Sequence, residues 1–118
     1  MAKIDHDDVK QAYALLNNLK YELKNEPYGK NNQFLAFDEL YQVIDKTLYD
    51  LKHQSYEGIT LSIRLGKTMS YINDALAFRG LRLSEKQAQA WDLFIHPTDK
   101  SLQKNEVIFK LINQFGVW

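Results

Sequence analysis

The chain has 118 residues, of which 45% are apolar and 13% aromatic, enough side chain to close one hydrophobic core. Its 15 basic and 15 acidic residues cancel, which argues against a protein whose main task is to coat nucleic acid. The absence of cysteine excludes a disulfide framework, a thiolate metal site and a cysteine nucleophile. We therefore expect a single helical domain spanning residues 1–118.

The N-terminal region predicts a cytoplasmic protein. Acidic residues at Asp5, Asp7 and Asp8 stand where a signal peptide needs an apolar run of about 7–15 residues. The longest apolar runs are far shorter than the ~20 residues that span a bilayer. Any membrane contact is therefore expected to be peripheral, at the inner face of the membrane, or made through another protein.

Two helices are predicted in the first half of the chain. Behind Asp7 or Asp8 as N-cap, apolar residues recur at intervals of three and four until Pro27: Val9, Ala12, Tyr13, Leu16, Leu19 and Leu23. The polar stretch 26–32 is rich in helix breakers and predicts a loop. From about Gln33 to His53 the same spacing returns and predicts a second helix with its core side at Phe37, Leu40, Tyr41, Ile44, Thr47, Leu48 and Leu51.

A third helix is predicted between two glycines. Gly58 is the stop signal of the second helix, Thr60 is the expected N-cap of the third, and Gly80 ends it. The pattern places Ile63 at the flank and these residues on the core side: Leu61, Leu65, Met69, Ile72 and Leu76.

The fourth helix carries the clearest start signal in the chain. In Ser84-Glu85-Lys86-Gln87, the Ser84 hydroxyl can accept from the Gln87 amide while the Gln87 side chain reaches back to the Ser84 amide. Leu83 is expected to pack against Ala88. The helix should run from Glu85 to about Ile95, with an inward face formed by Ala88, Trp91 and Phe94 or Ile95.

A short C-terminal helix is predicted beyond Pro97, which bends the chain near His96. Apolar residues keep helical spacing there until Gly116: Leu102, Val107, Ile108, Leu111, Ile112 and Phe115. No stretch alternates apolar and polar residues well enough to predict a strand. The sequence therefore predicts an all-α fold: an antiparallel up-and-down four-helix bundle with an additional short C-terminal helix packed across one side.

None of the residue types that carry catalysis stands in a catalytic pattern. Gly66-Lys67-Thr68 is similar to the end of a phosphate-binding loop, but Leu61 occupies the position where that loop needs glycine. Gly66 is instead expected to allow the close approach of a neighbouring helix. No serine has a nucleophile setting, neighbouring carboxylates diverge on a helix, and metal-ligand spacing is lacking at His6, His53 and His96. We expect no enzyme activity, no cofactor and no metal.

Two features remain as candidate partner-binding surfaces. One is the cationic cluster Arg79, Arg82 and Lys86, which either contacts a partner or complements the C-terminal end of the third helix. The other is the apolar C-terminal segment, in which the chain end either folds back or is offered to a partner; its candidate contact residues are Phe109, Phe115 and Trp118. Residues 59–118 carry eight basic and five acidic residues, which fits a partner-facing surface and chance equally well.

The third and fourth predicted helices resemble the enterocin A/pediocin-type immunity family, small cytosolic proteins that protect producers of pediocin-like, class IIa bacteriocins from their own peptide. In that family a Leu/Ile-Tyr helix is followed by a basic-apolar-basic-apolar turn and a Ser/Thr-Glu start. This chain matches with Arg64-Leu65, Tyr71-Ile72 and Arg79-Gly80-Leu81-Arg82-Leu83-Ser84-Glu85. The similarity in sequence pattern covers about residues 61–94.

The resemblance implies a left-turning antiparallel four-helix bundle without catalysis. We expect a monomer, with a weak dimer as the alternative. The resemblance also implies protection at the bacteriocin receptor, the membrane part of the mannose phosphotransferase system, from the cytosolic side, with the C-terminal half choosing the bacteriocin. Carried onto this chain, it points to Arg79, Arg82 and Lys86 and to Phe109, Phe115 and Trp118. The alternative is a soluble helical adaptor or regulator that uses the same turn and aromatic tail to bind another protein or, weakly, nucleic acid.

Overall fold

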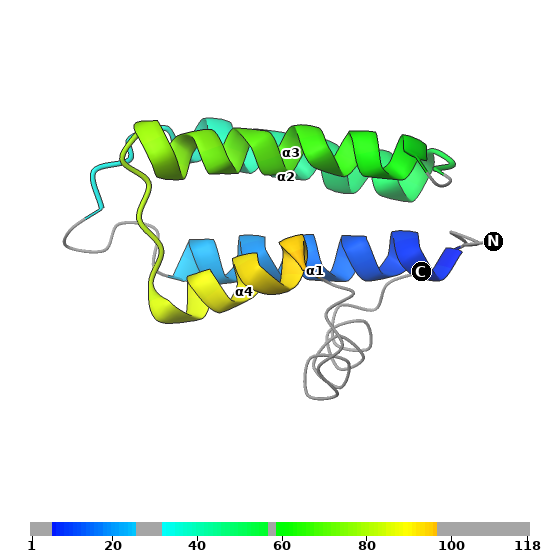
Figure 1. The fold of residues 1–118 in the computed structure, drawn as a ribbon, viewed down its shortest axis with the longest axis horizontal. Coiled ribbons are helices and arrows are strands. Elements are labelled where there is room, and N and C mark those ends of the chain that lie inside the picture. The colour runs from blue at the N-terminus through cyan, green and yellow to red at the C-terminus, as the bar shows by residue number, and fades with distance from the viewer. Residues whose placement is uncertain (1–5, 26–31, 57–58, 97–118) are drawn as a thin grey trace.

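The computed structural model describes residues 6–25, 32–56 and 59–96, and this part of the chain is all-α, as predicted (Figure 1). Four helices account for most of it: α1 (His6–Asn25), α2 (Phe37–His53), α3 (Ile59–Phe78) and α4 (Glu85–Ile95). The predicted C-terminal helix, together with Phe109, Phe115 and Trp118, lies outside the described residues.

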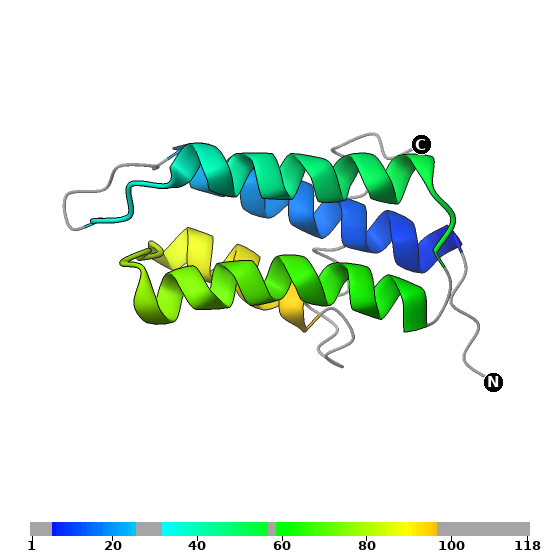
Figure 2. The same cartoon turned by 90° about the horizontal axis from the view of Figure 1, so that it is seen from above.

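The four helices form two layers (Figures 1 and 2). Helices α2 and α3 lie side by side in one layer, and α1 and α4 lie side by side in the other. Helix α1 also contacts α2, which joins the layers. The apolar sides of the helices therefore meet between the layers, in the arrangement of a helical bundle.

The core consists of a large and a small cluster. The large cluster takes buried side chains from all four helices, among them Leu16, Leu19, Leu23, Leu40, Ile44, Ile72, Trp91 and Phe94. The small cluster contains Val9, Ala12, Leu51 and Leu61, which come from α1, α2 and α3. Helix α4 has 11 residues and is about 16 Å long, whereas the 20-residue α1 and α3 are about 30 Å long. This difference explains why α4 contributes to the large cluster alone.

Helix α1 confirms the predicted stripe and widens it. Five of the six predicted residues are buried, and Tyr13 is half-buried. The pattern missed Ala14 and Leu15, which are also fully buried. Because α1 contacts both α2 and α4, its buried face covers more of its circumference than a single apolar stripe.

Helix α2 begins at Phe37, so the prediction of a start near Gln33 was wrong. The Asn32 side chain sets the non-helical path: its Oδ1 accepts from the Phe34 amide at 3.1 Å, a turn that competes with helix formation. Phe34 is buried and meets the Phe37 ring edge-on, with 5.2 Å between ring centroids. The segment 32–36 is therefore an ordered lead into α2.

The predicted end of helix α3 near Gly80 is confirmed, but its predicted start at Thr60 is wrong. Gly80 has a φ of 85°, in the left-handed region that glycine tolerates, and the Leu81 amide donates to the Ala75 carbonyl at 3.1 Å. Thr60 lies inside the helix, which begins at Ile59, so its assignment as N-cap was wrong.

The inward face of α3 is more polar than predicted. Leu61 and Ile72 are buried, while Leu65, Met69 and Leu76 are half-buried; Thr68 and Ala75, which the pattern missed, are fully buried. The predicted role of Gly66 was wrong, because nothing in the described residues lies within 4 Å of the position that a Cβ would take. No neighbouring helix uses the space that this glycine leaves.

Helix α4 has the predicted bounds and the predicted capping box. The Gln87 amide donates to Ser84 Oγ at 3.3 Å, and the Ser84 amide donates to Gln87 Oε1 at 2.9 Å. Ala88 is exposed, so its predicted place on the inward face was wrong. Gln87 is buried instead. Its Nε2 donates to the Glu22 carbonyl of α1 at 3.0 Å, so this side of α4 faces α1. The buried face is Gln87, Ala90, Trp91 and Phe94.

Candidate partner-binding site

The predicted cationic turn lies at one end of the bundle, against the segment that leads into α2. Asn32 Nδ2 donates to the Arg82 carbonyl at 3.0 Å, and a Cβ on Gly80 would lie 3.7 Å from the Gln33 carbonyl carbon. Leu81 is buried in the large core cluster. We call residues 32–36, 78–83 and the first turn of α4 the turn end. Its backbone is held by these contacts on both sides.

Arg79 is engaged within the protein. Its guanidinium carbon lies 5.7 Å from the centroid of the Phe34 ring and 5.3 Å from that of Tyr71, distances that allow cation–π attraction to both rings. Its Nη2 is 3.9 Å from Glu39 Oε1. Arg79 therefore connects α3, α2 and the segment 32–36, and its side chain is only partly available to a partner.

Tyr71 lies under Arg79 and carries an unusual hydroxyl. The hydroxyl oxygen is buried and has no hydrogen-bond partner among the described residues. Burial raises the pKa of the phenol, the nearby Glu39 carboxylate raises it further, and Arg79 opposes these effects. The phenol stays neutral at physiological pH, so Tyr71 offers a half-buried ring and not an ionised group.

Arg82 and Lys86 are the outward-facing members of the cationic cluster. Both side chains are exposed, and neither makes an ion pair among the described residues. Glu85 stands between them in the first turn of α4, where an acid is favoured by the helix dipole. A guanidinium and an ammonium with this freedom can bind carboxylate or phosphate oxygens of a partner.

Two exposed apolar residues at the turn end were missed from the sequence. Leu35 is 97% exposed and Phe78 is 83% exposed, the highest values among the large apolar side chains described. The sequence pattern assigned Leu35 to neither side of a helix, because residues 34–37 are uniformly apolar and only the non-helical path turns Phe34 inward and Leu35 outward. Phe78 lies less than one helical turn beyond Ala75, which is buried. No signal in the sequence predicts that Ala75 is buried and Phe78 exposed.

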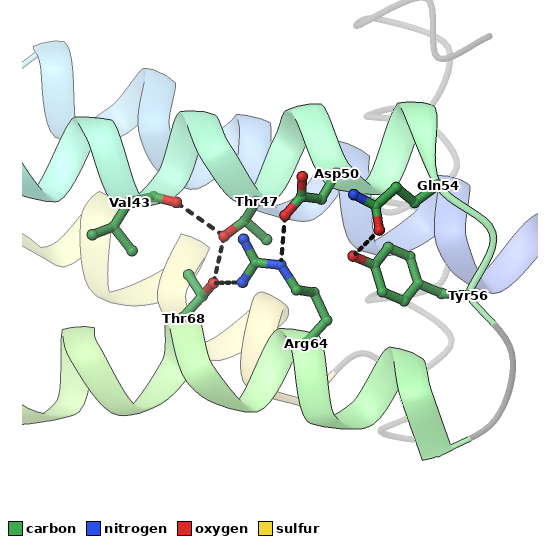
Figure 3. Close-up of polar contacts among 7 residues, drawn as sticks. All are labelled: Val43, Thr47, Asp50, Gln54, Tyr56, Arg64 and Thr68. Carbon is green, nitrogen blue, oxygen red and sulfur yellow. Dashed lines mark hydrogen bonds and ion pairs between the residues drawn. The ribbon is translucent and has the colours of Figure 1, made fainter.

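A second polar cluster joins α2 and α3 in the middle of their length (Figure 3). Arg64 Nε donates to Asp50 Oδ2 at 3.0 Å, and both side chains are mostly buried. Arg64 Nη1 lies 3.5 Å from Thr68 Oγ1, which is 2.6 Å from Thr47 Oγ1. Thr47 Oγ1 donates to the Val43 carbonyl at 2.9 Å.

The direction of the hydrogen bonds in this cluster follows from its two ends. A guanidinium can only donate and a carbonyl can only accept, so Thr47 uses its proton on Val43 and the Thr68 proton must point at Thr47. Both threonine protons are therefore committed. Because neither hydroxyl faces a base that would take its proton, the cluster is a structural link between helices and not a nucleophilic site.

In the described part of the chain, no three His, Asp or Glu side chains are grouped so as to hold a metal ion. None of the helices described is long and apolar enough to cross a bilayer. Comparison with protein family models, curated proteins and solved structures gives no match to this chain. The functional assignment therefore rests on the residues and their arrangement.

Proposed function

We propose that the protein is a bacteriocin immunity protein: a non-enzymatic, cytoplasmic, antiparallel up-and-down bundle that protects the cell from a pediocin-like bacteriocin. The observation that carries the proposal is the α3–α4 hairpin. Its turn is closed by Gly80, its second helix is capped by Ser84 and Gln87, and Arg82 and Lys86 are left free at the turn. The family that the sequence resembles combines the same elements in a single unit.

The proposed partner is the membrane permease of the mannose phosphotransferase system with its bound bacteriocin, contacted from the cytosolic side by a monomer. The turn end supplies Arg82 and Lys86, and the C-terminal segment supplies Phe109, Phe115 and Trp118. Protection would arise from differential binding, because a protein that prefers a closed receptor state shifts the population toward it. Moving an evenly populated receptor to 99% closed needs a preference of about 100-fold, or about 2.7 kcal/mol.

The test is the inhibitory concentration of a panel of pediocin-like bacteriocins on a sensitive strain that carries the gene or an empty vector. We expect a selective rise of about tenfold or more against one or a few peptides. The double variant R82E/K86E should lose this protection. The charge-matched control K46E/K52E changes two exposed lysines of α2, away from the turn end, and should keep it. If the protein is expressed and the inhibitory concentration of every peptide is the same as with the empty vector, the proposal is refuted.

A helical adaptor is the second candidate, favoured by the exposure of Leu35 and Phe78 beside free cations, which suits many protein partners. Gene neighbourhood separates the two candidates. A neighbouring gene for a short secreted peptide with a double-glycine leader and a YGNGV-like start supports immunity. Regulatory or phage genes in its place support the adaptor.

A further inference from the structure

The outer side of α3 carries a stripe of five exposed residues. They recur at intervals of three and four positions, which places them on one side of an α-helix: Ile63, Lys67, Ser70, Asp74 and Phe78. Helix α3 packs on α2 through its other side, which carries Thr68 (Figure 2). Gly66 lies beside the stripe, and a Cβ there would meet nothing within 4 Å in the described part of the chain. We call the five exposed residues the α3 stripe.

The α3 stripe is apolar at both ends and charged nearer its middle. Ile63 is 55% exposed and Phe78 is 83% exposed. Lys67 stands four positions inward from Ile63, and Asp74 stands four positions inward from Phe78. The two halves therefore have the same order of residue types with opposite charges. Single exposed apolar residues are ordinary, whereas a stripe with this symmetry matches a copy of itself that runs in the opposite direction.

The two charges of the α3 stripe are available to a partner. Lys67 and Asp74 make no ion pair among the described residues, and their separation of seven positions, about 10 Å along the helix, is too large for them to pair with each other. The third charged residue of α3 is Arg64, which binds Asp50 of α2. Self-recognition uses the order of the two opposite charges along α3 and not a surplus of either sign, so charges on neighbouring helices do not decide it.

We propose that the α3 stripe is a docking surface for a second copy of this chain, packed antiparallel across a two-fold axis that passes near Ser70. In that arrangement Ile63 of each copy faces Phe78 of the other, and Lys67 of each copy faces Asp74 of the other, because both pairs are centred on the same point of the helix. A parallel arrangement would place like charges opposite each other. The antiparallel pair therefore brings apolar onto apolar and cation onto anion at four places.

The contact is small, so the dimer is weak. Residues 63–78 span about 22 Å of helix, and a helix with its side chains is about 10 Å wide. This is less than a stable interface, which buries about 1,200 Å² or more in total. We expect a dissociation constant between about 10 µM and about 1 mM, which leaves the monomer that is proposed to bind the permease well populated. Self-association needs neither the permease nor the bacteriocin, so it stands independently of the proposed function.

The experiment is sedimentation velocity of the full chain at concentrations from about 10 µM to about 1 mM. K67D and D74K should each weaken self-association about tenfold, because the two-fold axis turns two attractive pairs into two repulsive ones. A mixture of K67D and D74K should associate as the unaltered protein does, and so should the double variant K67D/D74K. In both cases every introduced charge meets an opposite charge, and a variant that had merely lost its fold could not be restored in this way.

The apolar ends of the stripe are tested in the same assay. I63S/F78S should weaken self-association about tenfold, whereas Y21S/Y49S, which removes two exposed aromatic rings from α1 and α2, should not. Circular dichroism of each variant confirms that its helices are intact.

Cross-linking locates the axis, since the chain has no native cysteine. On mild oxidation S70C should form a disulfide-linked dimer several times faster than S62C, because the two copies of Ser62 are about 25 Å apart in the proposed pair. The proposal is overturned if the unaltered protein is monomeric at every concentration, which would leave the α3 stripe to a different partner. It is also overturned if mixing K67D with D74K restores nothing, or if S62C cross-links as fast as S70C.

Discussion

The buried hydroxyl pair between α2 and α3 allows a sharp test of how these helices are joined. Thr47 and Thr68 are both 0% exposed, and their hydroxyl oxygens are 2.6 Å apart. Changing Thr68 to Ser removes a methyl group and keeps the hydroxyl, whereas changing it to Ala removes both. The stability difference between T68S and T68A therefore isolates the hydroxyl, apart from the small preference of helices for Ala.

The expected magnitude follows from the bonds that each change breaks. In T68A the Thr47 hydroxyl loses its donor and Arg64 loses an acceptor at 3.5 Å, while Arg64 keeps Asp50. T68A loses two hydrogen bonds, each worth about 0.5–1.5 kcal/mol net, while Thr47 keeps its bond to the Val43 carbonyl, so we expect T68A to be about 1–2 kcal/mol less stable than T68S. With Thr47 changed to Ala, the hydroxyl at position 68 has already lost its acceptor, and the same difference should shrink by about 0.5–1.5 kcal/mol.

Urea unfolding followed by helical circular dichroism provides the measurement. The unaltered protein, T68S, T68A and the same three backgrounds carrying T47A form the complete cycle. Equal slopes of unfolding free energy against urea show that the comparison is valid. A Ser-to-Ala difference that is the same with Thr47 and with Ala at that position would refute the hydroxyl pair.

Three further predictions concern single residues. G66A should stabilise the protein by about 0.5–1 kcal/mol in urea unfolding, because α3 gains a better helix former where a Cβ meets nothing. Q87E should destabilise it by about 1–3 kcal/mol: glutamate suits a capping box, but it cannot donate to the Glu22 carbonyl. Y71F should be neutral or slightly stabilising at neutral pH, since the buried hydroxyl has no described partner.

For G66A and Q87E, the opposite result would contradict the stated reason for the prediction. A destabilised G66A would mean that the outer side of α3 is covered, and a fully stable Q87E would mean that the cap alone matters. For Tyr71 the pKa is raised in the folded state, so its contribution to stability is present below about pH 10 and is lost as pH rises through the higher folded value. Y71F should therefore lose less stability than the unaltered protein between about pH 9 and pH 11.

Helix identity was predictable wherever a local signal and the apolar period agreed. The capping box at Ser84 defined the start of α4 to the residue, and Gly80 marked the end of α3. The prediction for residues 33–36 was wrong because Phe34, Ala36 and Phe37 have a spacing that suits a helix. The Asn32 turn that keeps these residues out of α2 is held by the Arg82 carbonyl, 50 positions away in the sequence. A contact so distant in sequence leaves no periodic trace.

Polar residues in the core were the hardest to predict. Gln87 reads as a cap residue, and its second role became visible only when α1 placed the Glu22 carbonyl beside it. Thr68 and Arg64 read as the polar side of α3, but they meet Thr47 and Asp50 of α2 (Figure 3). Thr47 was correctly placed on the core side of α2, because it falls in step with the apolar residues of that helix. Thr68 was missed, because apolar spacing does not record a residue that is buried against a polar partner.

The cationic cluster shows why residue type alone does not define a binding site. Arg79 and Arg82 are three positions apart and identical, but Gly80 turns the chain between them. Arg79 ends between two aromatic rings and near Glu39, while the Arg82 side chain faces solvent. Removing Arg79 would loosen the same backbone that presents Leu35, so a loss of protection in that variant would not separate binding from folding. Substitutions at Arg82 and Lys86 leave those contacts in place, and a loss of protection there would report on partner contact itself.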